Sequence, residues 1–199
     1  MTPTRVGSTL LLAVALFGIG SPIDSSAQPG QIVIRNEGRV IPYQATNYPA
    51  GPTDATSAVN VGNILNAHYY PGVKFYVSGN YAYAKNELDY VLARPQYIEN
   101  NPRRNELLST AYYIRGMIYF HHASGTGRYV LARNDFDEAI KLNAANHLAQ
   151  LELAKMMALA GQKDEAVAKL NRLLDEKPTA KVAEDAKKEL DRITSGKVE

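Results

Sequence analysis

Cysteine and tryptophan are both absent from this sequence of 199 residues. Without cysteine the chain has no disulfide framework, no thiolate metal site and no cysteine nucleophile. The absence of thiols suits an oxidising compartment without by itself establishing one. A hydrophobic core must therefore hold the fold, and a hydrophobic content of 45% is sufficient for one domain of this length.

An excess of charge of either sign is also lacking. Lys and Arg number 22 and Asp and Glu number 20, which gives a formal net charge of +2. The basic pairs Arg103–Arg104 and Lys187–Lys188 are short and interrupted, and we interpret them as solvated helix faces. No nucleic-acid partner is expected, because a surface that follows phosphates needs a clustered basic stripe.

Motifs of enzymes are missing as well. The sequence has no Gly-x-Ser-x-Gly nucleophile elbow and no Gly-x-x-x-x-Gly-Lys-Ser/Thr phosphate loop. Adjacent His121 and His122 would point about 100° apart on an α-helix, so they do not readily share a metal. A metal site completed by a neighbouring carboxylate is the alternative, and we place His122 or His147 at a helix end or on the surface. We expect no enzyme, no metal and no cofactor, since no pattern singles out a pair of catalytic carboxylates.

No later hydrophobic run matches the one near the N-terminus, and that run is short for a bilayer. The apolar residues Leu10–Ile19 follow the positive Arg5 and precede the small side chains of Ser25–Ala27. This order is typical of a secretory signal peptide, predicted at residues 1–27, with a membrane anchor as the alternative. We therefore expect a periplasmic protein with no membrane span in the mature chain.

Residues 28–53 are rich in Pro, Gly, Asn and Tyr and predict an extended arm and linker. Within the arm, Ile32–Ile34 and Val40–Ile41 flank Asn36–Gly38, which favours a small β-hairpin with glycine at its turn. An isolated hairpin is marginal in water, so it must dock or stay mobile. It could fold onto its own chain, add to another protein's sheet edge or swap between subunits.

From about residue 54 to residue 195 the apolar spacing is helical. Three segments repeat one pattern, in which a glycine is followed by an alanine and two large or apolar residues. The repeated residues are Gly79, Ala84, Leu88 and Val91; Gly127, Ala132, Phe136 and Ala139; and Gly161, Ala166, Leu170 and Leu173. Glycine permits a sharp turn between helices, alanine permits close approach, and the large residue fills the space between helix pairs.

This spacing resembles the tetratricopeptide repeat family, whose unit is a helix–turn–helix of about 34 residues. The second unit adds Tyr112 and Gly116 at the aromatic and small positions of the family, and Pro178 closes the third. The resemblance implies an all-α, right-handed solenoid of about three helix pairs with a polar C-terminal capping helix and a short N-terminal hairpin arm. The expected units cover about 65–96, 109–144 and 147–178, with the capping helix at 179–194.

Two departures from the family pattern carry predictions of their own. Pro71 lies within the expected first helix of unit one, so that helix should break or kink. Unit two has about four additional residues between Gly116 and Gly127, which predict either one added helical turn or a protruding loop.

The resemblance also implies a site, because the first helix of each pair lines the concave face of such a solenoid. The implied groove is apolar and tyrosine-rich, and it has too few Lys, Arg or Asn residues to clamp a charged peptide terminus. The predicted binding residues are Tyr69, Val73, Tyr76, Tyr113, Met117, Phe120, His121, Leu151 and Lys155, with Val77, Thr110, Leu148 and Leu159 beside them.

We expect a non-enzymatic adaptor that holds another protein, periplasmic or envelope-associated, or a second copy of itself, as a helix or an extended segment. One alternative is a carrier for an apolar, lipid-like small molecule, held between the tyrosine-rich helices 69–83 and 111–122. A second alternative is structural, with the same residues packing only against the hairpin or the capping helix.

Cleavage after Ala27 would make Gln28 the first residue of the mature chain. Intact-mass measurement of the protein recovered from a bacterial periplasm is therefore expected to show the loss of residues 1–27. Recovery of the full-length mass in the membrane fraction would favour the uncleaved anchor instead.

Overall fold

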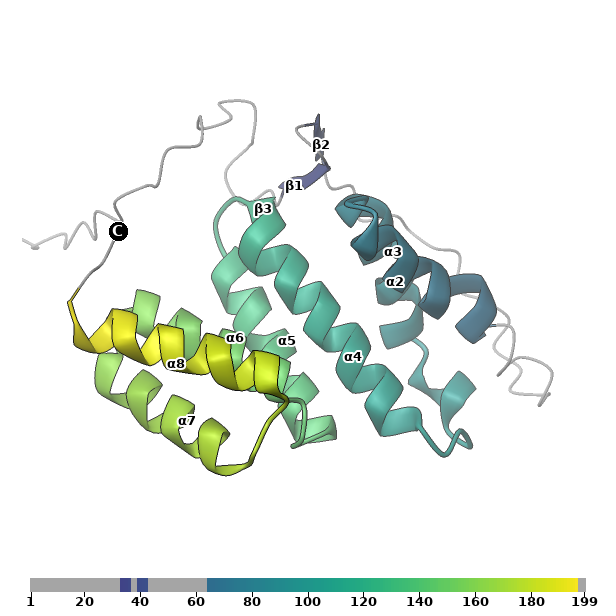
Figure 1. Cartoon of the computed structure of the whole chain (residues 1–199). Coiled ribbons are helices and arrows are strands. Elements are labelled where there is room, and N and C mark those ends of the chain that lie inside the picture. The colour runs from purple at the N-terminus through teal and green to yellow at the C-terminus, as the bar shows by residue number, and fades with distance from the viewer. Residues whose placement is uncertain (1–32, 37–38, 43–63, 197–199) are drawn as a thin grey trace, which may run out of the picture.

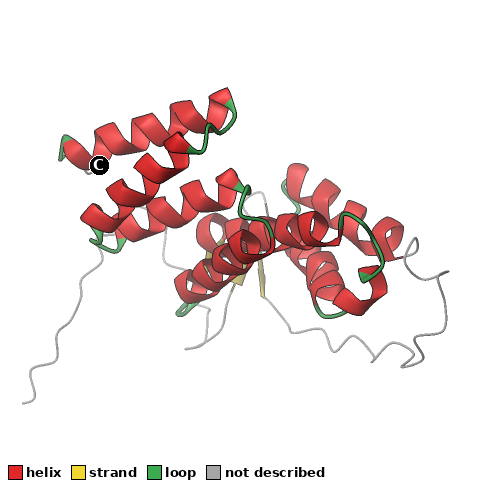
Figure 2. Cartoon of the chain, turned by 90° about the horizontal axis from the view of Figure 1, so that it is seen from below, coloured by secondary structure: helices red, strands yellow, loops and turns green. Residues whose placement is uncertain are grey.

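A computed structural model of the chain describes residues 33–36, 39–42 and 64–196. The predicted signal peptide at 1–27, and most of the arm and linker predicted at 28–53, lie outside these residues. Within them the chain is almost wholly helical, and Figure 2 shows the helices joined by short loops with the strands gathered at one place.

Three helix pairs follow one another along the chain and end in one further helix (Figure 1). Unit one consists of the π-helical turn η1 (Leu65–Tyr69), α2 (Tyr70–Val77) and α3 (Tyr81–Leu92). Unit two consists of α4 (Arg104–Met117), the π-helical turn η3 (Ile118–His122) and α5 (Arg128–Leu142). Unit three consists of α6 (His147–Leu159) and α7 (Lys163–Asp175), and the last helix is α8 (Ala180–Thr194). The helices pack in pairs within units and in sequence order between them, with α8 against both α6 and α7. The predicted all-α solenoid with its capping helix is confirmed.

The repeated residues occupy equivalent places in the three units. Gly79, Gly127 and Gly161 all adopt positive φ angles, of 78°, 89° and 83°, between the two helices of their pairs. This is the left-handed region that glycine enters without steric cost. The repeated alanines and large residues that follow are all fully buried: Ala84, Leu88 and Val91; Ala132, Phe136 and Ala139; Ala166, Leu170 and Leu173.

The two helices of a unit meet at a small residue on the first helix. A β-carbon placed on Gly116 of α4 would lie 2.7 Å and 2.9 Å from the ring of Phe136 and 3.3 Å from the Ala132 carbonyl oxygen, both on α5. In unit one, a β-carbon on Gly72 would lie 3.1 Å from Leu88. Gly72 thus has the role of Gly116, which the sequence pattern alone did not reveal.

The first helix of unit one continues through Pro71 without a break. The Tyr70 N–H bonds to the Leu65 carbonyl five residues back, which makes a π-helical turn, and Pro71 then lies in the first turn of α2. Pro71 has no N–H to donate to the preceding turn, and the wider π turn just before it is where the helix accommodates that missing bond. The expected irregularity is present, but as a π turn rather than as a break.

The additional residues of unit two form both a helical turn and a strand. After the π turn η3, the strand β3 (Ala123–Ser124) pairs antiparallel with β1 (Val33–Asn36), which in turn pairs with β2 (Arg39–Pro42). The sheet order is β2–β1–β3, with Ile34 opposite Ala123. The predicted hairpin therefore folds onto its own chain, at unit two.

Between α3 and α4 the chain differs from the expected boundaries. A 3-10 helix, η2 (Pro95–Ile98), buries Ile98 completely, and α4 begins at Arg104, earlier than the predicted start of unit two at 109. Ile98 is thus part of the core although its proline- and asparagine-rich surroundings resemble a loop.

Unit one is joined to unit two by a chain of buried and half-buried charges. Arg115 of α4 donates to Asp135 of α5 at 2.7 and 2.8 Å and to Asp89 of α3 at 2.8 Å, and Asp89 also pairs with the buried Lys85. Burial works against the charged form of Arg115, but its contacts with the two aspartates outweigh that effect and raise its pKa. A half-buried cation with three good hydrogen bonds is satisfied, so this network links the two units without leaving an unpaired charge at their contact.

The substitution Gly116→Ala is expected to lower the free energy of unfolding by about 1–3 kcal/mol, because the new methyl group overlaps a buried ring that has little room to shift. Gly72→Ala is the comparison variant and should lower the free energy of unfolding by less, since the contacts of its new methyl group are longer. Urea unfolding followed by circular dichroism measures both variants. An unchanged midpoint for Gly116→Ala would contradict the close packing of α4 on α5.

Candidate binding face

The first helices of the three units bring side chains to one polar cluster. Tyr76 of α2, Tyr113 of α4 and Glu152 of α6 interact electrostatically. Burial is the main cause that raises the pKa of each tyrosine, and the Glu152 carboxylate raises both further. Residues far apart in the sequence thus converge on one side of the solenoid.

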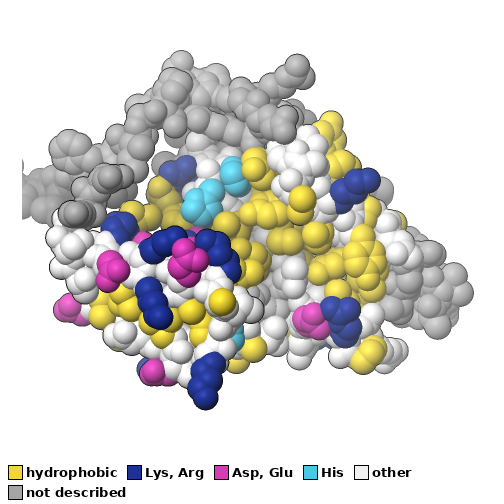
Figure 3. Space-filling view, in the orientation of Figure 1, with side chains coloured by type: hydrophobic (Ala, Val, Ile, Leu, Met, Phe, Trp, Pro, Cys, Tyr) yellow, Lys and Arg dark blue, Asp and Glu magenta, His cyan; other side chains and the backbone are white. Residues whose placement is uncertain are grey.

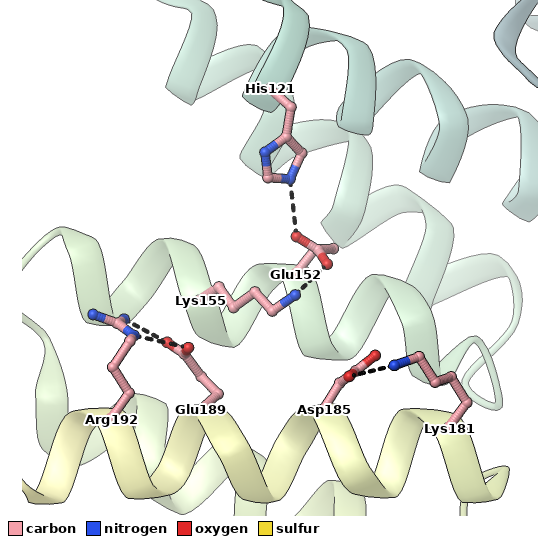
Figure 4. Close-up of polar contacts among 7 residues, drawn as sticks. All are labelled: His121, Glu152, Lys155, Lys181, Asp185, Glu189 and Arg192. Carbon is pink, nitrogen blue, oxygen red and sulfur yellow. Dashed lines mark hydrogen bonds and ion pairs between the residues drawn. The ribbon is translucent and has the colours of Figure 1, made fainter. Parts of the chain in front are cut away.

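Glu152 is the centre of this cluster, and its side chain is 8% exposed. The Nε2 atom of His121 lies 3.2 Å from one carboxylate oxygen, and the Lys155 ammonium donates to the other at 2.7 Å (Figure 4). Burial alone would raise the pKa of Glu152, but the hydrogen bonds and charges of these two partners outweigh it and lower the pKa. The carboxylate is therefore charged and fully engaged within the chain.

An apolar surface adjoins the cluster on the side of units one and two. Val73, Tyr76, Tyr113 and Met117 are half-buried and pack against the main core. Figure 3 shows hydrophobic side chains gathered over α2 and α4, with histidine and mixed charges toward α8. We call this surface, with His121 and Lys155 at its edge, the first-helix face.

Three residues of the predicted groove are buried rather than displayed. Tyr69 and Phe120 are in the main core, and burial raises the pKa of the Tyr69 hydroxyl. Leu151 is 2% exposed and belongs to the second core cluster, which contains Ala166 and Val182 of α7 and α8. Leu151 therefore holds the cap in place and is not available to a ligand.

Of the flanking residues, Val77, Leu148 and Leu159 are exposed. Val77 and Leu159 are close to the turns that end their helices, whereas Leu148 is at the start of α6.

The charged side of the site is internally neutralised. On α8, Lys181 pairs with Asp185 at 2.9 Å and Arg192 with Glu189 at 2.5 Å, and Figure 4 shows these pairs beside Glu152 and Lys155. Each carboxylate drawn has a cationic partner in the same chain. The part of α8 beside the site thus carries paired positive and negative side chains, with no net excess of either sign.

The histidines at the end of η3 serve different partners. The ring of His122 stacks on Tyr81 of α3, with centroids 3.6 Å apart, whereas His121 contacts Glu152. Burial, with the neighbouring His121 as a second cause, lowers the pKa of His122 to about 4, so this ring is neutral at pH 7. His147 is the first residue of α6, 3.3 Å from Glu176. The described residues contain no group of three or more His, Asp or Glu side chains arranged to hold a metal.

Among the residues at 64–196 and in the two strands of the arm, no helix is both long and apolar enough to span a bilayer.

Comparisons with known proteins show little similarity at the level of sequence. No family model matches the chain, and no curated protein matches it. One similar solved structure is described as the first TPR of Spaghetti (RPAP3) bound to the HSP90 peptide SRMEEVD; it has a TM-score of 0.49 and 17% identity, over 70% of this chain and 97% of that chain. The fold assignment rests on the turns and contacts of the present chain.

Glu152 should contribute to stability only while it is ionised. Because its pKa in the folded state is lower than the ordinary 4.5, the contribution is present above pH 4.5 and is lost as the pH falls through the folded value. The variant Glu152→Gln is expected to be less stable than the parent at pH 7, by about 1–2 kcal/mol, with the difference shrinking below pH 4.5. Urea unfolding at pH 7, 5 and 3.5 tests this, and a difference that does not depend on pH would contradict it.

Proposed function

We propose that this chain is a non-enzymatic binding protein that holds a segment of another protein on its first-helix face. The observation that supports this most directly is the convergence of Tyr76, Tyr113 and Glu152 from three units on one side. Half-buried aromatic and apolar side chains that border a satisfied polar cluster suit a protein partner, since they bury apolar area and still offer directional hydrogen bonds.

The proposal includes an extracytoplasmic location. The support is the order of charge, apolar run and small residues at 1–27, together with the lack of cysteine, and the partner would then be a protein of the periplasm or envelope. The lipid-carrier alternative stays a prediction. Tyr69, in the first of the two helices concerned, is buried in the main core, and no observation favours a lipid there.

A charge on the first-helix face should abolish partner binding. In Met117→Arg, the half-buried methionine is replaced by a guanidinium that would have to be desolvated on contact, which costs several kcal/mol. The measurement compares proteins cross-linked to the parent and to the variant in cells of the native host. Val130→Arg is the matched control, because Val130 is 63% exposed on α5 and lies outside the face.

The expected result is that partners of the parent are retained by Val130→Arg and lost by Met117→Arg, with both variants showing the helical circular dichroism of the parent. The same partners on Met117→Arg as on the parent would show that this face is not the interface. Val73→Arg provides a second variant on α2 should Met117→Arg fail to fold.

A further inference from the structure

We propose that the first-helix face takes its partner as an extended, uncharged, apolar segment, whose backbone carbonyl groups accept hydrogen bonds from the hydroxyls of Tyr76 and Tyr113. This inference rests on the proposed function and names the conformation and chemistry of the segment bound.

The two hydroxyls are unused donors. Among the residues that the structure describes, neither the Tyr76 nor the Tyr113 hydroxyl hydrogen-bonds to a protein group, and neither hydroxyl oxygen is fully buried. Their rings, by contrast, are fixed: Tyr76 lies against Tyr81 with centroids 5.8 Å apart, and Tyr113 against Phe136 at 6.2 Å. The donors are therefore held in place and reach solvent, so a partner can bind them without reorganising the face.

The conformation of the segment follows from which carbonyl groups are free to accept. In an α-helix the carbonyl groups are bonded internally except in the last turn, so a bound helix would present few acceptors to the tyrosines. In an extended or polyproline II segment the carbonyl groups are unbonded along the whole length. Two donors on successive units, α2 and α4, thus suit successive carbonyl groups of an extended chain.

The charge of the segment follows from Glu152. Its carboxylate opposes ionisation of both tyrosines. It also pairs with Lys155 and contacts His121, so neither cation is free to pair with a carboxylate of the partner. A carboxylate placed there would lose its hydration without gaining an ionic partner, whereas a neutral carbonyl group needs only the tyrosine hydroxyls.

The kind of side chain that the segment should carry follows from the residues on the same helices as the two tyrosines. Val73 and Met117, on the same helices, are half-buried and apolar. An extended segment with valine, isoleucine, proline or alanine side chains would bury them without leaving a polar group unpaired.

The test is a selection from a displayed library of random twelve-residue peptides on the immobilised full chain, followed by affinity measurements on synthetic binders. Enriched peptides are expected to be apolar, poor in Asp and Glu and rich in proline or β-branched residues. Each of Tyr76→Phe and Tyr113→Phe should weaken their binding about three- to tenfold, the effect of one lost hydrogen bond. Tyr83→Phe is the matched control and should change nothing, because Tyr83 is 56% exposed on α3.

A second measurement separates charge from shape. Each binder is synthesised with an amidated and with a free C-terminus, and the amide is expected to bind more tightly to the parent when that end lies beside Tyr113. In Glu152→Gln this preference should shrink. A preference that persists in Glu152→Gln would show that Glu152 does not exclude carboxylates.

The outcomes distinguish this inference from the broader proposal. Binders that are helical by circular dichroism, or that tolerate both tyrosine substitutions, would overturn the extended mode while leaving protein binding intact. A selection that enriches no peptide, together with unchanged cross-linking by Met117→Arg, would overturn both.

Discussion

The contact of Gly116 with Phe136 and Ala132 is the constraint on which the rest of the structure depends. Helices α4 and α5 approach so closely that no β-carbon fits between them without displacing a buried ring. A small residue on the first helix and a large one on the second therefore define the pair, and Gly72 and Leu88 repeat the arrangement in unit one. Since the pairs of units one and two close in this way, their first helices face one side, which is how Tyr76 and Tyr113 come together.

The repeated residues of the solenoid could be predicted because each position has one local physical cause. A turn with positive φ selects glycine, and a site without space for more than a methyl group selects alanine, whatever surrounds them. Gly72 was not recognised, because the adjacent Pro71 predicts a helix end and conceals a packing role. The burial of Ile98 depends on helices distant in the sequence, so a lone isoleucine in a proline-rich stretch gave no periodic signal.

The candidate site was predictable in its apolar part and not in its polar part. Val73, Tyr76, Tyr113 and Met117 lie on the first-helix face, as helical spacing and the family resemblance imply. Leu151 has the same spacing, yet α8 covers it, because the capping helix needs an apolar surface of its own. Glu152 was not singled out, since a carboxylate on a helix resembles a solvated residue until His121, 31 positions earlier in the chain, is placed beside it.

The additional residues of unit two connect these parts of the molecule. In unit one the first helix ends at Val77, five residues after Gly72, and the equivalent position in unit two is His121. Here the π turn η3 continues to His122, which sets His121 against Glu152 and His122 against Tyr81 of unit one. The chain then forms β3, to which β1 is paired. One departure from the repeat thus contacts unit one, unit three and the arm. It also contacts Glu152. On the binding mode proposed above, the irregular part of the solenoid, rather than its regular part, therefore sets which segments bind.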